Sequence, residues 1–555
     1  MKNALTLLLS LLAMTVWAQK TSLDFELKKG KLYDGLERHE SVRLTLLEET
    51  PEEIYVLRSE HKDKMHFLRQ VSTIARAYEM ATEKDYGRYY LERYSKDMER
   101  EESHLIFDAE KYDYDRVFLQ AFEMADTFYA FFSEKDRSDK RYLYVQRLDK
   151  QSLKPVGRMS RLTSTSVFGE RSRQPGTFFM QLSEDGSQLA ILSTVPGVKE
   201  KKARFKVQVF GKGLQLLWEQ EMKLRTPGNL FRFMDFLFDK QGNAHVLGKI
   251  YDEYETDCNK KKKTHKWVIF SMYPDGQNNK VQIDSKSDPY IFDAQLFQQD
   301  ASSLMCLGLY SDVNASLTRT FAGLSRHIFS VQDLSEQSAE FIPFDKDILP
   351  EIMSPYEKRM ALKRLSKGKT PYFHAPWSRT IFRNDGGFVL LFESWGNVAQ
   401  SLSMASFSAD GQLEWGRYMW KGEKSEKSVL SSMTNNEPPP IPFNYALAIV
   451  DDKMYFVFND SPKNLGATLS DDEKIKSMSN DKTTWILAVQ VITADGEVFP
   501  REQVADYEDL EIVANPGGYF YLTEKENALL LYGEYRENYR LFKLAFQGLF
   551  QYKRL

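Results

Sequence analysis

The sequence is poor in the residues that build metal and redox sites. It has only 2 cysteines and 8 histidines in 555 residues. Cys258 and Cys306 lie too far apart for the C-x-x-C pairs of a structural zinc site, and no two histidines have the H-E-x-x-H spacing of a zinc protease. We therefore predict no metal site and no cofactor. The two cysteines could pair in an oxidising compartment, but the apolar strand around Cys306 favours a buried free thiol.

Motifs of nucleophilic, phosphate and calcium chemistry are also missing. The chain has no G-x-S-x-G nucleophile elbow and no D-x-D-x-D-G calcium loop. Lys367-Gly368-Lys369-Thr370 is similar to the end of a phosphate-binding loop, but Lys363 occupies the position of the first glycine and Pro371 would stop the following helix. His245 lies in an apolar strand, so we interpret it as a core or channel residue rather than a ligand. The motifs predict no catalytic residue, and we do not favour an enzyme.

A strong charge of one sign is absent as well. The formal net charge is -4, and acidic and basic residues are interspersed along the whole chain. A nucleic-acid binding protein would instead gather lysine and arginine into a basic patch that contacts the phosphates. The charge pattern therefore predicts no nucleic-acid partner.

Long apolar runs are absent after the first residues. Met1-Lys2-Asn3 is followed by a mostly apolar stretch and then by polar residues, which is the pattern of a signal peptide over 1–18 with cleavage after Ala18. No cysteine follows this stretch to carry a lipid, and no later stretch approaches the ~20 apolar residues of a spanning helix. We expect an exported protein without a transmembrane span, either periplasmic or associated with the outer membrane or cell surface.

The sequence does contain a repeated β unit, from about residue 110 onward. Each copy has a polar turn, a strongly apolar strand, a loop, and an alternating strand that ends in a second turn. Turns such as Asp410-Gly411 and Asp495-Gly496 fit tight hairpins. The apolar strands of seven copies can be aligned: 127–132, 188–193, 244–248, 303–309, 388–392, 454–458 and 528–532.

This repetition predicts an all-β fold, namely a β-propeller with four-stranded antiparallel blades. Equivalent turns are about 55 to 60 residues apart, and up to about 85 where a loop is inserted. A closed ring also hides the sheet edges that so many strands would expose. We favour seven blades, with six or eight also compatible, because 52–110 shows only one clear strand, Tyr89–Tyr94. The mature chain, 19–555, is predicted to be one propeller domain, closed by an outer strand from Asp24–Leu32 or Ser41–Leu47.

A short helical insertion is expected between two blades, near 345–370 and within 345–375. Ser354 and Pro355 provide the N-cap and first-turn proline of a helix that should stop near Gly368. Its basic face is a candidate surface for a membrane or an acidic partner, and the alternative is a solvated helix lying on the propeller.

Several strand-and-turn motifs recur in a recognisable order over roughly 176–546. The chain thereby resembles a family of uncharacterised secreted β-propeller proteins of Gram-negative bacteria. The resemblance implies the fold and the exported location, and it implies no active site. The motifs that carry it are Phe236 with Asp239, Gly242-Asn243, Leu309-Tyr310-Ser311-Asp312, Asp385-Gly386-Gly387, Glu414-Trp415 and Phe456-Val457-Phe458-Asn459-Asp460.

Acidic side chains follow equivalent apolar strands, so a propeller would carry them on one face. They are candidate binding residues for a cation, a sugar or a basic peptide, and the alternative is that they are solvated strand ends. We favour a non-catalytic propeller that binds a protein partner or belongs to an envelope assembly. The alternatives are a glycan-binding module and a carbohydrate-active hydrolase or lyase that uses these carboxylates. The candidates are Asp252, Asp312, Glu393, Asp460 and Glu534.

Overall fold

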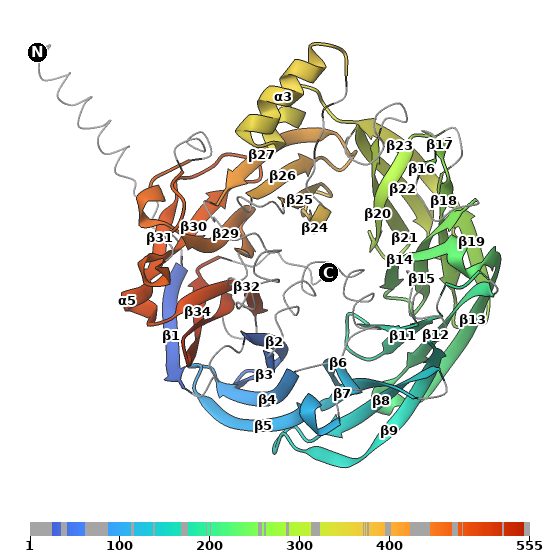
Figure 1. Cartoon of the computed structure of the whole chain (residues 1–555), viewed down its shortest axis with the longest axis horizontal. Helices are drawn as coiled ribbons and strands as arrows, with labels where there is room; N and C mark the ends of the chain where they lie inside the picture. The colour runs from blue at the N-terminus through green and yellow to red at the C-terminus, as the bar shows by residue number, and fades with distance from the viewer. Residues whose placement is uncertain are drawn as a thin grey trace, which may run out of the picture.

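A computed structural model of the chain contains eight four-stranded antiparallel sheets arranged as blades in a closed ring (Figure 1). The fold is therefore an all-β propeller with eight blades, one more than the favoured number and within the range that the sequence allowed. The structure describes residues 25–34, 41–61, 87–112, 116–136, 139–167, 176–195, 197–199, 201–252, 258–259, 262–284, 288–311, 322–369, 371, 373, 377–394, 401–421, 445–468, 475–479, 481–523 and 527–548.

The blades follow one another along the chain, and each runs from its innermost to its outermost strand. Blade 1 holds β2 (Ser41–Glu49), β3 (Glu53–His61), β4 (Gly87–Ser95) and β5 (Arg100–Asp108). Blade 2 holds β6 (Arg116–Met124), β7 (Thr127–Lys135), β8 (Lys140–Leu148) and β9 (Pro155–Ser166). Blade 3 holds β10 (Phe178–Leu182), β11 (Leu189–Thr194), β12 (Lys202–Phe210) and β13 (Leu216–Pro227). Blade 4 holds β14 (Phe231–Phe238), β15 (Ala244–Tyr251), β18 (His265–Met272) and β19 (Asn278–Gln282), with the small pair β16 (Cys258–Asn259) and β17 (Lys262–Lys263) between β15 and β18.

The second half of the ring repeats this arrangement. Blade 5 holds β20 (Tyr290–Gln298), β21 (Ser303–Ser311), β22 (Gly323–Ser330) and β23 (Glu336–Pro343). Blade 6 holds β24 (Trp377–Phe382), β25 (Phe388–Ser394), β26 (Ser401–Phe407) and β27 (Leu413–Trp420). Blade 7 holds β28 (Tyr445–Val450), β29 (Lys453–Asp460), β30 (Ile486–Ile492) and β31 (Glu502–Asp506). Blade 8 holds β32 (Val513–Leu522), β33 (Ala528–Tyr535), β34 (Asn538–Phe546) and β1 (Phe25–Tyr33).

The ring is closed by strand β1, the first strand of the chain. It pairs antiparallel with β34, from Phe25 opposite Phe546 to Tyr33 opposite Tyr539, and so supplies the outer strand of blade 8. This confirms the predicted closure and selects the first of the two candidate segments. The other segment, now β2, is the innermost strand of blade 1.

The apolar core is divided among the interfaces between blades. Each of eight buried apolar clusters joins two neighbouring blades, and together they occupy all eight interfaces. At the closing interface, Ile54 and Val56 of blade 1 pack with Leu530 and Leu541 of blade 8, all of them no more than 1% exposed. Because each fully buried side chain of this size stabilises the fold by about 1.5–3 kcal/mol, the ring is held together mainly by these interfaces.

A polar tie repeats from blade to blade near the outer strands. In six of the interfaces a side chain of one blade donates a hydrogen bond to a backbone carbonyl of the next blade, in the turn between its third and fourth strands. Gln220 Nε2 to Tyr273 O, at 2.6 Å, and Trp415 Nε1 to Ala494 O, at 2.8 Å, are two examples. The other donors are Arg93, Asn279, Arg326 and Lys543, whose acceptors are the carbonyls of Gln151, Asp333, Ala409 and Lys96. The tie from Lys543 crosses the closing interface.

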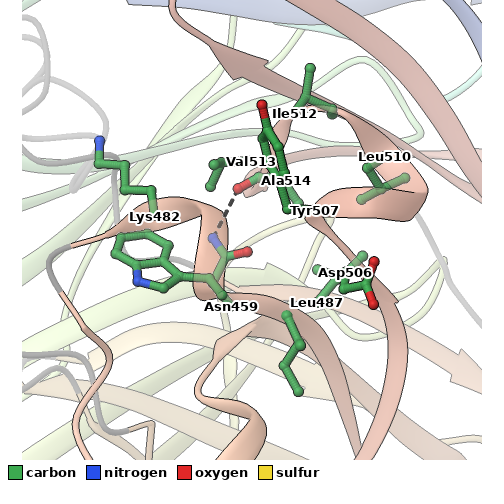
Figure 2. A pocket seen from close by; sticks show the side chains of 11 residues that line it. Asn459, Lys482, Leu487, Asp506, Tyr507, Leu510, Ile512, Val513 and Ala514 are labelled. Carbon is green, nitrogen blue, oxygen red and sulfur yellow. Dashed lines mark hydrogen bonds between the residues drawn. The ribbon is translucent and has the colours of Figure 1, made fainter.

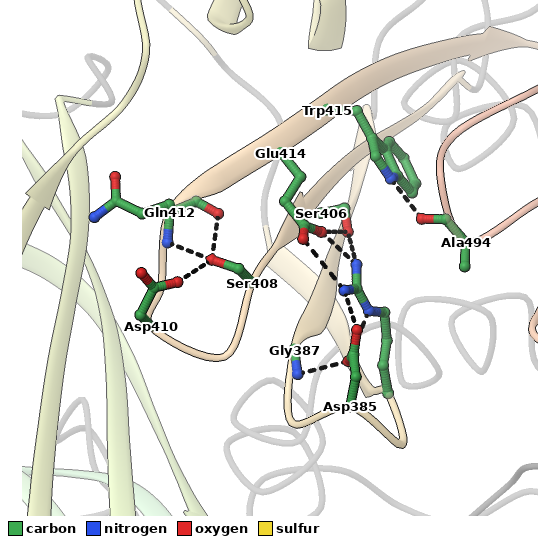
Figure 3. A network of polar contacts seen from close by, with 10 residues as sticks. Asp385, Gly387, Ser406, Ser408, Asp410, Gln412, Glu414, Trp415 and Ala494 are labelled. Atoms are coloured by element: carbon green, nitrogen blue, oxygen red, sulfur yellow. Dashed lines mark hydrogen bonds and ion pairs between the residues drawn. The ribbon is translucent and has the colours of Figure 1, made fainter.

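The tie between blades 6 and 7 requires a glycine. The Trp415 ring lies against Gly496, which has φ +82, and a Cβ at that position would lie 2.8 Å from the ring. Beside Trp415, Glu414 and Asp385 both form ion pairs with Arg383, which also donates to Ser406 Oγ at 2.6 Å (Figure 3). The positive φ and the close approach of the Trp415 ring together require glycine at position 496.

The two faces of the ring differ. The turn face carries the connections between first and second strands and between third and fourth strands, and these are short, as in 125–126, 451–452 and 408–412. The loop face carries the connections between second and third strands and between blades, which include 62–86, 344–376 and 461–485. Long connections on one face of a rigid scaffold are where propellers vary most freely.

The predicted insertion is α3 (Pro355–Leu365), between β23 and β24, and it stands at the outer edge of the ring (Figure 1). Ser354 Oγ accepts from Glu357 N and the Glu357 side chain accepts from Ser354 N, so a complete capping box begins the helix. Gly368, with φ +65, follows its last turn as expected. The preceding turn, η5 (Leu349–Ile352), packs against blade 6, where Ile352 lies next to Gly416.

Candidate functional site

Four of the five predicted carboxylates lie among the described residues, in blades 4, 6, 7 and 8. Asp252 follows β15 and is exposed, Glu393 lies in β25, Asp460 ends β29, and Glu534 lies in β33. Because second strands run toward the loop face, these four share that face, as the sequence predicted. Asp312 lies outside the described residues.

Asp460 is held in a buried ion pair. Its Oδ2 lies 2.7 Å from Arg501 Nη1, and both side chains are no more than 1% exposed. Its Oδ1 accepts from Asn464 Nδ2 at 2.6 Å and from Ser461 N at 2.8 Å. Burial raises the pKa of Asp460, although Arg501 opposes the shift. Arg501 also donates to Trp420 O, so the ion pair links blade 7 to blade 6 on the loop face. Both oxygens of Asp460 accept hydrogen bonds within the protein, so neither is available to a ligand.

A small pocket lies between blades 7 and 8 (Figure 2), and Glu534 is not among the residues that line it. Asn459 Nδ2 donates to Ala514 O at 2.9 Å and joins the two blades there. At the edge of the pocket, Lys482 Nζ lies 6.0 Å from the ring centre of Trp485. Burial lowers the pKa of Lys482, and the charge of Glu534 opposes this shift. The pocket therefore combines an apolar floor with the ammonium group of Lys482 and the carboxylate of Asp506.

Glu393 belongs to a polar cluster built from the inner strands of blades 6, 7 and 8. Burial and the Glu393 carboxylate raise the pKa of Tyr445, the first residue of β28. Arg379 of β24 donates to the hydroxyl of Tyr519 in β32, and its Cζ lies 5.7 Å from that ring centre. Tyr521 donates to the Leu447 carbonyl. Sequence reasoning found Glu393 and missed Arg379, because an arginine in a short strand forms no motif.

Two acids that sequence reasoning also missed lie on the inner strands of blades 4 and 5. Asp235 and Asp293 each follow a β-bulge, so they occupy equivalent positions. Asp235 accepts from Leu296 N at 2.9 Å and thereby joins the two strands. Burial raises the pKa of Asp235 to about 6, with a further contribution from Asp293. Burial likewise raises the pKa of Asp293 to about 6, although Lys249 opposes the shift.

His245 is a structural residue. Its Nε2 lies 2.9 Å from Asp239 Oδ2 and its Nδ1 lies 2.6 Å from Ser271 Oγ. The three residue types are those of a hydrolytic triad, but His245 and Ser271 are both 0% exposed. A substrate cannot reach that hydroxyl, so the set instead fixes the turn after β14 to the third strand of its blade. This agrees with the interpretation of His245 as a core residue.

The described part of the chain contains no group of three or more histidine, cysteine, aspartate or glutamate side chains that could hold a metal ion. Cys306 is a buried free thiol, so it does not form the possible disulfide with Cys258. Burial also raises the pKa of this thiol. Among the described helices, none is long and apolar enough to cross a membrane. The predicted signal peptide, 1–18, lies outside the described residues.

Comparisons with known proteins find only similarities of structure. No family model and no curated protein matches the sequence. The propeller domain of the Trilobed protease from Pyrococcus furiosus is 9% identical, with a TM-score of 0.33 over 84% of this chain and 97% of that one. A polysaccharide lyase is 9% identical, with a TM-score of 0.35 over 77% and 89%. Prolyl oligopeptidase B from Galerina marginata is 9% identical, with a TM-score of 0.37, and the match covers 90% of this chain but 55% of that one.

Proposed function

We propose that this protein is a non-catalytic binding propeller of the bacterial cell envelope and that its partner is a protein. The observation that carries the proposal is the outer side of α3, where large apolar side chains remain exposed on a rigid, capped helix. Tyr356 is 66% exposed, Met360 45% and Leu362 50%. Apolar side chains concentrated on so short an element are typical of an interaction surface.

The charges around these residues suggest the character of the partner. Arg359 and Lys363 are exposed between the apolar side chains. The helix's only acid, Glu357, is engaged in the capping box, and Lys358 pairs with Glu351 at 2.6 Å outside the helix. The outer side is therefore apolar and cationic, which favours a partner surface that combines apolar and acidic side chains.

The long connections of the loop face and the predicted signal peptide support the same proposal. A rigid ring with one face of long connections presents a broad surface for a macromolecule. Export would place the protein in the periplasm or at the outer membrane, where envelope assemblies form.

Affinity purification of the tagged mature protein from its native envelope tests this function. The wild type is compared with a variant that carries Tyr356→Ser, Met360→Ser and Leu362→Ser. The matched control is Leu216→Ser with Leu217→Ser, which removes two apolar side chains of β13 that are each 48% exposed. We expect a stoichiometric protein partner with the wild type and the control, and its loss with the α3 variant. Recovery of a clean monomer in all three samples would refute the proposal.

A carbohydrate-active enzyme or a glycan-binding module is the second candidate, because the half-buried acids Asp235 and Asp293 occupy equivalent positions on two neighbouring inner strands. Glycoside cleavage uses two carboxyl groups, one of them protonated and the other ionised. Glycan turnover by the wild type, lost in Asp235→Asn, would favour the enzyme. A glycan that raises the melting temperature without any product would favour the binding module.

A further inference from the structure

The inner strands of blades 6, 7 and 8 hold an arginine in an unusual setting. Arg379 follows a β-bulge in β24, where the register with β25 shifts between Trp377 and Arg379. Its guanidinium donates to the hydroxyl of Tyr519, which belongs to the second blade along the ring. The side chain therefore extends across the inner strand of blade 7, and Tyr445 of that strand contributes to the electrostatic environment of the guanidinium.

Tyr519 is positioned by an irregularity of its own strand. The register between β32 and β33 shifts between Asn515 and Phe520, and the intervening residues, which include Tyr519, leave the regular ladder. The rings of Tyr519 and Tyr521 are 5.7 Å apart and meet edge to face. Two bulges in separate blades thus bring one guanidinium and flat aromatic rings together, and bulges often aim side chains in this way at functional sites.

Arg379 forms no ion pair with a carboxylate of the described residues, and its hydrogen-bond acceptor is a neutral hydroxyl. Glu393, the acid of the same cluster, interacts with Tyr445. The nearby arginine of the same blade, Arg383, instead pairs with Asp385 and Glu414. The buried Arg501 pairs with Asp460. Arg379 is half-buried, and a partly desolvated cation with a neutral partner favours binding of an anion.

Arg379, Tyr519 and Tyr521 are each partly exposed rather than enclosed. A planar fork of donors matches an oxyanion, and the rings beside it offer faces for a sugar or another flat group.

We propose that Arg379 and Tyr519 form a binding site for the oxyanion of a small acidic ligand, with Tyr521 beside it. The carboxylate, sulfate or phosphate group accepts hydrogen bonds from the guanidinium. The hydroxyl of Tyr519 accepts from Arg379 and is free to donate its own proton to the same anion. This site is independent of the outer side of α3 and of the protein partner proposed above.

Calorimetry and thermal shift on the full mature chain test the site. The probes are glucuronate, sulfate and inorganic phosphate, each added at an ionic strength held constant with chloride. We expect at least one of them to bind and to raise the melting temperature, and its identity distinguishes a carboxylate ligand from a sulfate or phosphate ligand. Arg379→Gln should weaken binding at least tenfold, and Arg379→Lys should weaken it less, because the charge remains while the fork is lost.

Two further variants keep the test decisive if Arg379→Gln folds poorly. Tyr519→Phe removes one hydroxyl and should weaken binding severalfold with little change in the melting temperature of the free protein. Arg383→Gln removes an arginine of the same blade on the turn face, so it should lower that melting temperature and leave the affinity unchanged. The proposal is overturned if none of the three anions binds at tens of millimolar, or if Arg379→Gln and Tyr519→Phe both bind like the wild type.

Discussion

The half-buried acids Asp235 and Asp293 should make the propeller more stable in mild acid than at neutral pH. The pKa of each carboxyl is raised from 3.8 to about 6, so the folded protein binds a proton more tightly than the unfolded chain. A raised pKa contributes stability that is complete below about pH 4 and is lost as the pH rises through about 6. A shift of this size corresponds to roughly 3 kcal/mol for each carboxyl. Because both side chains are only half-buried, solvent reduces the effect to about 1–3 kcal/mol.

The predicted change can be measured as a difference between two proteins. Only part of this contribution is present at pH 5, so the two groups together account for about 1–3 kcal/mol between pH 5 and pH 7.5. For a chain of this length, 1 kcal/mol changes the melting temperature by about 1 °C, so the wild type should melt about 1–3 °C higher at pH 5 than at pH 7.5 through these groups. The double variant Asp235→Asn, Asp293→Asn lacks both titrations and should lose that difference. The amide oxygen of the asparagine can still accept from Leu296 N, and it does not titrate between these pH values. An unchanged pH dependence in the double variant would refute the assignment of the raised pKa values to these acids.

Three other predictions concern the buried ion pair of Asp460, the turn at Gly496 and the cap of α3. Removing one partner of the buried ion pair, by Arg501→Met or Asp460→Asn, should lower the free energy of unfolding in urea by about 3–5 kcal/mol, and a loss below about 1 kcal/mol would contradict its structural role. Gly496→Ala should destabilise the protein by at least about 2 kcal/mol, because its φ is +82 and the new Cβ would meet the Trp415 ring, so a neutral effect on the melting temperature would show that the tie is loose. Ser354→Ala removes the N-cap of α3 and should cost about 1 kcal/mol locally, which hydrogen exchange would detect as roughly fivefold faster exchange in α3 alone. Equal exchange in the variant and the wild type would mean that the capping box does not stabilise the helix.

Most of the fold could be predicted because the second strand of a blade is buried on both sides. The seven apolar strands found in the sequence are β7, β11, β15, β21, β25, β29 and β33, each the second strand of its blade. The missing eighth is β3, which contains Arg58, Ser59 and Glu60, all of them buried. Arg58 Nε pairs with the fully buried Glu92 at 2.9 Å, so a buried ionic pair replaces the apolar pattern there. The sequence signal was absent because the charges compensate each other only in three dimensions.

The candidate site was predictable only in part, for a related reason. The position of Asp460 at the loop face follows from the strand repeat, but its ion pair depends on Arg501, 41 residues away in the chain. Arg379, Asp235 and Asp293 each follow a bulge, and a bulge changes which way a side chain points without leaving a trace in the strand pattern. Sequence periodicity therefore identifies which residues end at a face, but it does not identify which of them remain available to a ligand.

The central claim is that α3 is the contact surface for a protein partner, and photo-crosslinking from the helix tests it most directly. A photoreactive phenylalanine analogue replaces Met360, which is 45% exposed, or Leu216, which is 48% exposed on β13. Both tagged proteins are irradiated in their native envelope. We predict one discrete protein adduct from position 360 and none from position 216. Adducts to lipid alone, or the same faint adducts from both positions, would contradict the account.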